Sequence, residues 1–269
     1  MKLAVLGGGN IGTAIAKGLA ASGKFRPDQI VITRRKAHLL DDLRGKGFIV
    51  QADNADAVKR AEVVVVSVLP QQVTGVLREI RDSLVPGRHV LVSVVTGVSI
   101  NEMKKHVGKD VAIVRAMPNI AITIRESMTC LAAGAGAADT LETVKLLFDC
   151  VGRTLVIDEE QMIAATALAA CGVAFFLRAI RAASQGGIEI GFHPAEALVM
   201  AAQTARGAAA LLLASDDHPE GEIDKVTTPR GCTIAGLNKM EHEGFSSAMI
   251  QGITTSAQKA AQLYENEGK

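Results

Sequence analysis

The sequence is poor in the residues from which several kinds of functional site are built. It has no Trp, and aromatic residues make up only 3 % of its 269 residues, which disfavours a stacking surface for single-stranded nucleic acid. Lys and Arg number 29 against 28 Asp and Glu, so no long-range field attracts nucleic acid or an anionic membrane. Its six histidines show no metal-ligand spacing, and no C-x-x-C pair occurs among its four cysteines, Cys130, Cys150, Cys171 and Cys232. We therefore expect neither a disulfide framework nor a metal site.

The sequence also lacks a hydrophobic run of the length that a membrane span needs. The apolar run after Met1 stops at Gly7, whereas a secretory signal needs roughly 7–15 apolar residues. The longest uncharged apolar stretch, residues 162–177, falls below the ~20 residues of a bilayer-spanning helix. We interpret it as a buried helix and expect a soluble, cytoplasmic protein.

The first half of the sequence alternates between strand-like and helix-like segments. Short β-branched runs predict strands at residues 3–6, 30–33, 63–68, 90–94 and 111–114, with two more at 128–132 and 154–157. Helical patterns lie between the first five, at residues 11–21, 36–43, 55–60, 72–84 and 100–107. Such alternation is typical of right-handed crossovers and a parallel sheet covered on both faces. We predict an α/β domain of the Rossmann type over residues 1–157.

From Asp158 onward the strand patterns disappear and alanine dominates. Residues 164–214 contain 18 Ala and no lysine, and Asp158 and Pro194 fit the N-cap and the first position of helices. The apolar content of these helices exceeds what each could bury alone. We therefore predict an all-α dimerisation domain over residues 158–269 that packs against a second subunit. A self-contained helical bundle is the alternative.

A glycine-rich turn follows the first predicted strand directly. Residues 7–12, Gly-Gly-Gly-Asn-Ile-Gly, fit the G-x-G-x-x-G pattern and open a predicted helix, which is the context of a dinucleotide site. Gly7 would allow the tight turn, Gly9 the close approach of a pyrophosphate, and Gly12 close packing of helix on strand. The first helical turn, with Asn10 and Ile11, would offer free N–H groups to the anion. A purely structural turn is the alternative.

The end of the second predicted strand favours NADP over NAD. NAD-binding folds carry an acid there for the ribose 2′-hydroxyl, whereas this sequence has Thr33-Arg34-Arg35-Lys36. Arg34 and Arg35 would offer planar, bidentate donors to a 2′-phosphate. Like charges at a helix start are unfavourable without an anion, although a solvated charged surface is the alternative. We predict NADPH as the cofactor, with NADH as a second choice.

Two further strand ends mark the expected position of the nicotinamide. Ligands of parallel sheets bind beyond the carboxyl ends of the strands. The third strand ends in residues 65–71, which include Val68 and Pro70, and the fourth ends in residues 93–97. Each segment is also consistent with an ordinary strand end.

The predicted substrate side offers an anion site but little that could act as a general base. Dehydrogenation of an alcohol commonly uses His or Lys as the base, and no lysine lies between Lys145 and Lys225. The sequence therefore favours an electrophilic C=N substrate, which needs orientation rather than a base. Thr228 and Pro229 resemble an N-cap pair, after which residues 231–233 would expose amides and a hydroxyl to a carboxylate. A simple capped loop is the alternative.

Over nearly its whole length the chain resembles the pyrroline-5-carboxylate reductase family. The resemblance rests on residues 6–19, 67–71, 115–119, 165–176, 202–204 with 207–209, and most specifically on 228–237 followed by Glu243-Gly244-Phe245. It implies a Rossmann domain joined to an interlocking helical domain, in a homodimer that often assembles further. It also implies NADPH-dependent reduction of 1-pyrroline-5-carboxylate to L-proline, a step of proline biosynthesis.

The resemblance also implies roles for individual residues. Thr233 matches the residue that contacts the imine nitrogen or its proton and is the expected catalytic residue. Thr228, Gly231 and Cys232 match the carboxylate-binding loop, and Met117 and Asn119 match a segment that lines the nicotinamide.

The chain departs from the family pattern beside the expected substrate. Residues 169–175 lose two serines, a proline and a tyrosine hydroxyl, and Leu69 replaces a common lysine. Two alternatives therefore stay open. One is a reductase for another cyclic imine, and the other is a non-catalytic NADP-binding regulatory protein.

Overall fold

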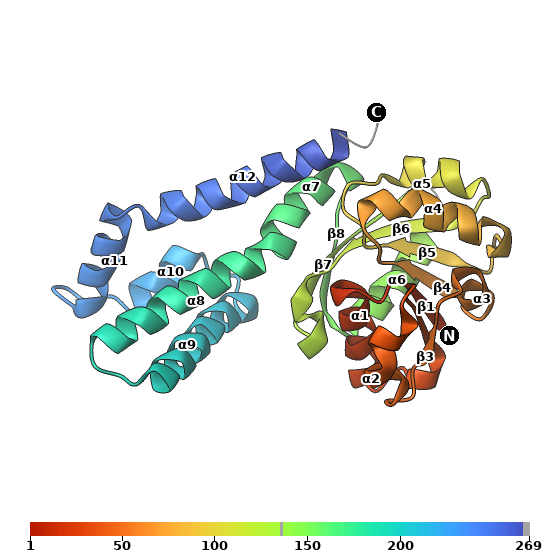
Figure 1. Ribbon diagram of the computed structural model, residues 1–269. Coiled ribbons are helices and arrows are strands. Elements are labelled where there is room, and N and C mark those ends of the chain that lie inside the picture. The colour runs from red at the N-terminus through yellow and green to blue at the C-terminus, as the bar shows by residue number, and fades with distance from the viewer. Residues whose placement is uncertain (135–136, 266–269) are drawn as a thin grey trace. The chain divides into compact units, whose positions relative to one another are not determined.

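The computed structural model in Figure 1 describes residues 1–134 and 137–265. The chain divides into two compact units, one made of Met1–Cys171 with Ser256–Lys269 and the other of Gly172–Thr255. The compact units therefore separate after Cys171, and the functional boundary at 157/158 stays a prediction.

The first unit is built on one eight-stranded sheet of order β3-β2-β1-β4-β5-β6-β7-β8. The strands are β1 (Leu3–Leu6), β2 (Ile30–Thr33), β3 (Ile49–Gln51), β4 (Val63–Val66), β5 (Val90–Ser93), β6 (Ala112–Met117), β7 (Ser127–Ala133) and β8 (Gly152–Val156). β1 pairs in parallel with β2 on one side and with β4 on the other. The strands that follow β1 are therefore added first on one side of it and then on the other. This makes the carboxyl end of β1 the switch point where ligands bind.

The predicted parallel sheet contains one antiparallel pair of strands. β6 and β7 run antiparallel, with Met117 opposite Cys130. The connection between them is a short stretch around the 3₁₀-helix η4 (Ile120–Ile124), whereas a parallel crossover needs a dozen or more residues. β8 then pairs in parallel with β7.

Helices cover both faces of this sheet, as predicted for the Rossmann-type half. The α-helices are α1 (Asn10–Ala21), α2 (Asp41–Arg44), α3 (Asn54–Lys59), α4 (Pro70–Ile80), α5 (Ile100–Val107), α6 (Ala138–Asp149) and α7 (Met162–Ala165). The 3₁₀-helices are η1 (Pro27–Gln29), η2 (Ala37–Leu40), η3 (Arg81–Ser83), η4 and η5 (Glu159–Gln161). β4 consists of four valines: Val63 and Val65 join the apolar cluster under α1 and α6, while Val64 and Val66 join the cluster under α3, α4 and α5. A strand that is apolar on both sides is the signature of a sheet buried on both faces.

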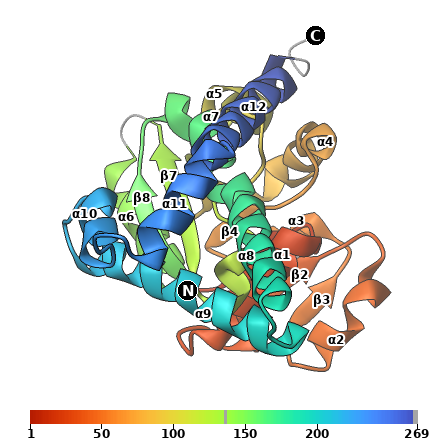
Figure 2. The same cartoon turned by 90° about the vertical axis from the view of Figure 1, so that its left-hand side faces the viewer.

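The second unit is entirely helical, as predicted. A π-helix at the end of the first unit, Thr166–Cys171, leads into α8 (Gly172–Glu189), which is followed by α9 (Pro194–Ala214), α10 (Pro219–Lys225), α11 (Cys232–His242) and α12 (Phe245–Glu265). α8 and α9 lie side by side in Figures 1 and 2. Pro194 occupies the first position of α9, as its place in the sequence predicted.

This helical unit has almost no core of its own. Between residues 172 and 255 the buried residues are Gly172, Ser184 and Ala197, while Phe176 and Leu213 are each 60 % exposed. Residues 162–177 were predicted to form a buried helix. In the single chain Met162 is buried, as predicted, but Phe176 and Leu177 are exposed. The alternative of a self-contained bundle does not fit these exposures.

Two helical stretches are long and apolar enough to cross a membrane, judged by length and composition alone. They are Glu159–Glu189 and Pro194–Ala214. Most of the apolar side chains of these two stretches are exposed in the single chain. Contacts from outside this chain are therefore needed to bury them.

Candidate active site

The glycine-rich turn lies at the switch point of the sheet and holds a conformation that only glycines allow. Gly7 has φ +108°, and a Cβ on it would lie 2.1 Å from the Ser67 carbonyl oxygen. A Cβ on Gly12 would lie 2.2 Å from the carbonyl oxygen of Gly7, so the helix approaches the strand too closely for any side chain. Nothing lies within 4 Å of a Cβ built on Gly9, which leaves this position open to a ligand. These environments match the three roles expected for the motif.

The helix α1 begins directly at this turn with Gly9 as its N-cap. The first backbone hydrogen bond of the helix runs from the Thr13 amide to the Gly9 carbonyl, at 2.9 Å. The N–H groups of Asn10, Ile11 and Gly12 precede it and are the ones a helix start leaves for an anion. The loop therefore fits a pyrophosphate.

The two arginines predicted to select NADPH occupy different environments. The Arg34 guanidinium donates to the Gly8 carbonyl at 3.1 Å and is half-buried against the glycine loop. Arg35 is exposed. Arg34 therefore supports the loop as well as offering charge, whereas Arg35 offers charge only.

Ser67 and Thr33 were not among the predicted site residues, yet both present hydroxyl groups next to the glycine loop. Ser67 follows β4 and is 7 % exposed; its Oγ has no hydrogen-bond partner among the described residues and lies 3.1 Å from a Cβ built on Gly12. An unpaired buried hydroxyl is costly, which is consistent with a ligand group completing the site. Thr33 Oγ1 donates to Asn54 Oδ1 at 2.6 Å, and Asn54 donates to Glu79 at 2.9 Å. A polar residue at the end of an apolar strand is the sequence signal that could have identified both hydroxyls.

The remaining cofactor predictions lie at the ends of β4 and β6. Pro70 is the first residue of α4, Val68 is half-buried just before it, and Leu69 between them is 64 % exposed. Met117 ends β6, and Asn119 follows it as the N-cap of η4; both residues are buried. The structure therefore brings the glycine loop and both strand ends to the same edge of the sheet.

The predicted carboxylate loop lies in the second unit and differs in one detail from the expectation. α11 begins at Cys232 with Gly231 as its N-cap, so the prediction that Thr228 and Pro229 start the helix is wrong. Instead, the Gly231 amide donates to the Thr228 carbonyl at 2.9 Å in a turn, and Arg230 has φ +61°. A Cβ on Gly231 would lie 2.4 Å from Thr228 Oγ1, so this hydroxyl sits directly over the helix start. The amides of Cys232 and Thr233 stand in the first turn, where an anion binds.

Comparison with known proteins decides the family. Residues 159–263 match a family model for pyrroline-5-carboxylate reductase dimerisation, and residues 2–97 match one for NADP oxidoreductase, coenzyme F420-dependent. Pyrroline-5-carboxylate reductase 2 of Dictyostelium discoideum is 46 % identical over 96 % of this chain and 92 % of its own length. The chain belongs to the pyrroline-5-carboxylate reductase family.

A further relative supports this membership, and a solved structure shares the fold. Pyrroline-5-carboxylate reductase 1 of D. discoideum is 54 % identical over 97 % of this chain, and the chain spans 50 % of that relative's length. The crystal structure of Plasmodium falciparum pyrroline carboxylate reductase with NADP bound shares the fold, with a TM-score of 0.88 at 22 % identity over 98 % of each chain.

The described residues hold no group of three or more His, Cys, Asp or Glu side chains that could bind a metal ion. The cysteines are all free. Burial raises the pKa of the Cys130 thiol, which keeps this residue protonated inside β7. No metal site therefore has a candidate among the described residues, and burial disfavours thiolate chemistry at Cys130.

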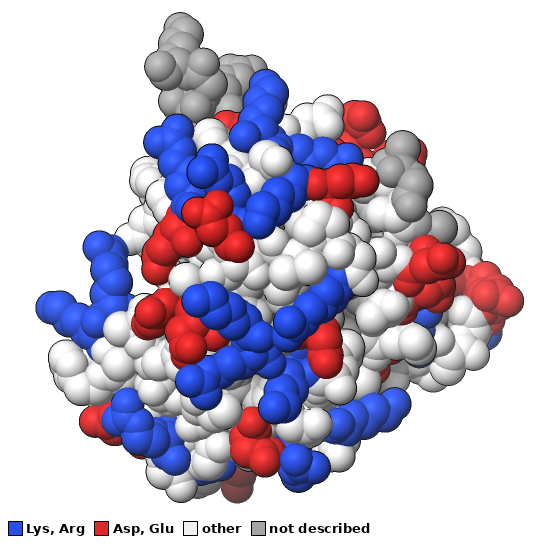
Figure 3. Space-filling model, turned by 90° about the vertical axis from the view of Figure 1, so that its right-hand side faces the viewer, with Lys and Arg blue, Asp and Glu red and all other residues white. Residues whose placement is uncertain are grey.

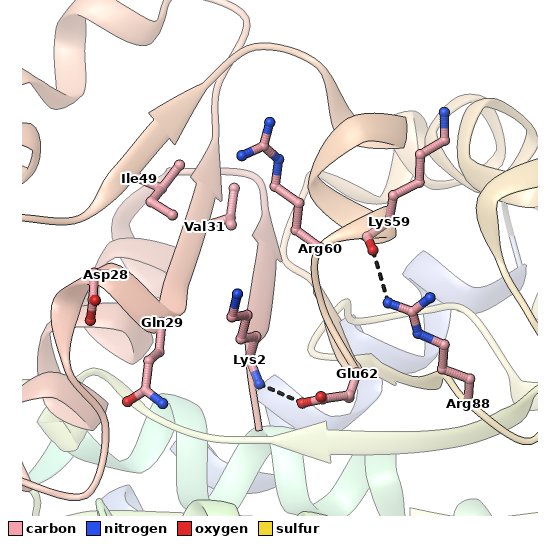
Figure 4. Close-up of a pocket in the computed structure, with 9 residues that line it drawn as sticks. All are labelled: Lys2, Asp28, Gln29, Val31, Ile49, Lys59, Arg60, Glu62 and Arg88. Atoms are coloured by element: carbon pink, nitrogen blue, oxygen red, sulfur yellow. Dashed lines mark hydrogen bonds between the residues drawn. The ribbon is translucent and has the colours of Figure 1, made fainter.

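A charged groove in this reductase-family chain lies at the wrong edge of the sheet for the cofactor (Figure 4). It has a volume of about 360 Å³ and is lined by residues at the amino ends of the strands, including Lys2, Gln29 and Glu62. Figure 3 shows basic side chains gathered on one face with acidic ones beside them. Within the groove, Arg88 donates to the Lys59 carbonyl at the end of α3, and Arg60 pairs with Asp56. Cations at a helix end stabilise its carbonyl groups, which accounts for the basic charge here.

Proposed function

We propose that this chain reduces 1-pyrroline-5-carboxylate to L-proline with NADPH. The observation that carries the proposal is that a member of this family holds two amide-lined loops, one at the switch point of the sheet and one at the start of α11. In the reaction, one hydride is added to the ring carbon of the C=N bond, and one proton ends on the ring nitrogen. NADPH supplies that hydride when bound.

The cofactor is held by residues of the first unit. The amides of Asn10 and Ile11, together with the open Gly9, bind the pyrophosphate. Arg35 and Arg34 bind the 2′-phosphate, and the unpaired Ser67 hydroxyl donates to the cofactor at the end of β4. Val68, Pro70 and the buried Met117 line the nicotinamide.

The substrate is held by the loop that starts α11. Thr228, Gly231 and Cys232 bind the carboxylate through the turn and the free helical amides. The Thr233 hydroxyl hydrogen-bonds the ring nitrogen and orients it for protonation, and this is the catalytic role we assign to it. No base is required, because the protonated C=N bond is already electrophilic.

The helical unit forms a homodimer of soluble, cytoplasmic subunits. This assembly is supported by the match to a dimerisation family model and by the exposed apolar faces of α8 and α9. An apolar face of this size needs a partner, and a second copy offers the matching surface. Assembly beyond the dimer would use faces that the dimer leaves free.

Oxidation of NADPH by the purified protein, with and without freshly prepared 1-pyrroline-5-carboxylate, tests the proposal. We expect substrate-dependent oxidation and stoichiometric L-proline. NADPH binding without turnover on this substrate would overturn the proposed substrate, and a panel of cyclic imines would then be the next measurement. The exposed Leu69 at the cofactor edge favours a less polar imine as the second candidate.

A further inference from the structure

A π-helix, Thr166–Cys171, lies between the sheet and the long helix α8. A π-turn holds an extra residue, is rare, and occurs mostly at functional sites. Its last three residues are small and half-buried: Ala169, Ala170 and Cys171. A small-residue surface of this kind admits close approach by a flat ring.

The segment that carries this π-helix is attached to the sheet at its start by an ion pair with a buried arginine. The Arg115 side chain on β6 is 3 % exposed and donates to Glu159 Oε1 at 3.2 Å. The same Glu159 oxygen accepts the Ile100 amide at 2.7 Å, at the first residue of α5. A buried charge requires its partner, so Glu159 fixes where the segment begins.

Apolar contacts then hold the middle of the segment against β6 and β7. Met162 is fully buried and packs with Met117, Cys130 and Ala132, and Ala170 packs against the edge of the same cluster. The segment therefore crosses these two strands from Arg115 toward the end of β6.

Asn119 attaches the far end of the segment. Its Nδ2 donates to the Ala169 carbonyl at 3.2 Å, within the π-helix, and its Oδ1 accepts the Ala121 amide at 3.0 Å. Both partners are backbone groups of fixed character, so only one orientation of the side-chain amide satisfies them. The backbone N–H of Asn119 also donates to the buried Ser127 hydroxyl at 3.1 Å.

These contacts leave Asn119 with little access to a ligand. The residue is 8 % exposed, and its backbone N–H and both polar side-chain atoms already bind the protein. This differs from the direct cofactor contact that its place in the sequence suggested.

We propose that Asn119 is a positioning residue that holds the π-helix on the sheet edge and so fixes the surface against which the imine ring lies over the nicotinamide. The effect of Asn119 on the substrate rests on the proposed function, whereas the attachment of the π-helix to the sheet does not. Asn119 acts through the Ala169 carbonyl and not by binding the cofactor.

Asn119→Ser is the variant that separates the two contacts. Serine caps helices well and keeps an acceptor for the Ala121 amide, but its side chain is too short to reach the Ala169 carbonyl. Asn119→Asp, which places an oxygen against that carbonyl, is the second variant. Asn101→Ser, on the exposed face of α5, is the matched control.

Three measurements on the full chain test the role. We expect amide hydrogen exchange across residues 166–174 to speed up at least fivefold in both Asn119 variants and to stay unchanged in the control. We expect the NADPH Kd to change less than threefold, and kcat/KM for the imine to fall at least tenfold.

Unchanged exchange across residues 166–174 would overturn the positioning role, as would an NADPH Kd weakened in parallel with turnover. If the wild-type protein were inactive on every imine and exchange still became faster in the Asn119 variants, the positioning contact would be upheld. The proposed reaction would then fail on its own.

Discussion

Arg34 and Arg35 are adjacent in sequence, but Arg34 binds the Gly8 carbonyl whereas Arg35 is exposed. Their effects on cofactor choice can therefore be separated. Replacing Arg35 by Ala removes charge from an exposed position. We expect the KM for NADPH to rise about tenfold, equivalent to ~1.4 kcal/mol, with little change for NADH. Steady-state kinetics with each cofactor measures this.

Replacing Arg34 by Ala also removes the hydrogen bond to the Gly8 carbonyl. We therefore expect this variant to raise the KM for both cofactors, with the larger rise for NADPH. Equal rises for NADPH and NADH in both variants would remove the basis for assigning the 2′-phosphate to these arginines.

His89 gives the folded chain a pH dependence that does not involve the active site. It is 2 % exposed before β5, and burial, with the neighbouring Arg88 charge, lowers its pKa. Its Nδ1 accepts the Val85 amide at 2.8 Å, which requires the neutral ring. Below the ordinary histidine pKa of about 6.5 the unfolded chain binds more protons than the folded one, so stability falls as pH falls through this range.

The variant His89→Asn tests this, because Asn Oδ1 can still accept the Val85 amide. We expect urea midpoints of the wild type to drop between about pH 7.5 and about pH 5.5, and this drop to shrink in His89→Asn. The exposed His242→Asn is the control and should retain the full drop. A drop of the same size in all three proteins would assign the effect to other groups.

At the level of single elements, the turn before α11 tolerates no side chain at Gly231. Gly231→Ala would place a methyl group 2.4 Å from Thr228 Oγ1 and 2.9 Å from the Thr228 carbonyl oxygen. The turn must open, which moves the amides proposed to bind the carboxylate. We expect the KM for the imine to rise at least tenfold with the KM for NADPH unchanged.

Gly221→Ala is the matched control, since nothing lies within 4 Å of a Cβ at this exposed position in α10. We expect it to leave both constants unchanged. A Gly231→Ala enzyme with wild-type KM for the imine would exclude this loop from substrate binding.

Element boundaries also show what could be predicted from the sequence. Short runs rich in β-branched residues identified β1, β2, β4 and β5, because a strand buried on both faces needs apolar side chains on both sides. β3 was missed because it has only three residues. No helix was predicted over residues 138–149, where α6 lies. The direction of β7 was missed because β-branched composition is the same for parallel and antiparallel strands.

The site was predictable where glycine or charge left a local signal. Gly7, Gly9 and Gly12 have the environments that the motif requires. The positioning role proposed for Asn119 could not be predicted, since it depends on Ala169, a residue distant in sequence. The π-helix leaves no trace in composition, because an inserted alanine looks like any other in an Ala-rich helix.

At the level of the whole molecule, α9 shows the largest demand for a partner. Val199 is 68 % exposed and borders an open apolar groove with Phe192 and Met200. We expect Val199→Glu to shift the protein toward monomer by several-fold in dissociation constant, since a buried carboxylate at an apolar interface is costly. Sedimentation velocity over a concentration series measures the shift.

Thr143→Glu adds the same charge on the exposed side of α6 in the first unit and serves as the control. We expect it to sediment as the wild type does. An unchanged Val199→Glu assembly would place the interface on another face of the helical unit.

A helical unit without a core of its own has a genetic consequence. In a cell that makes an intact chain and one inactivated at Thr233, both carry the same exposed helical faces and, in the proposed homodimer, would pair with each other. Where paired subunits depend on each other for activity, the defective allele then lowers activity below the half expected from gene dosage. An allele that instead disrupts α9 would leave its product unpaired and would behave as recessive.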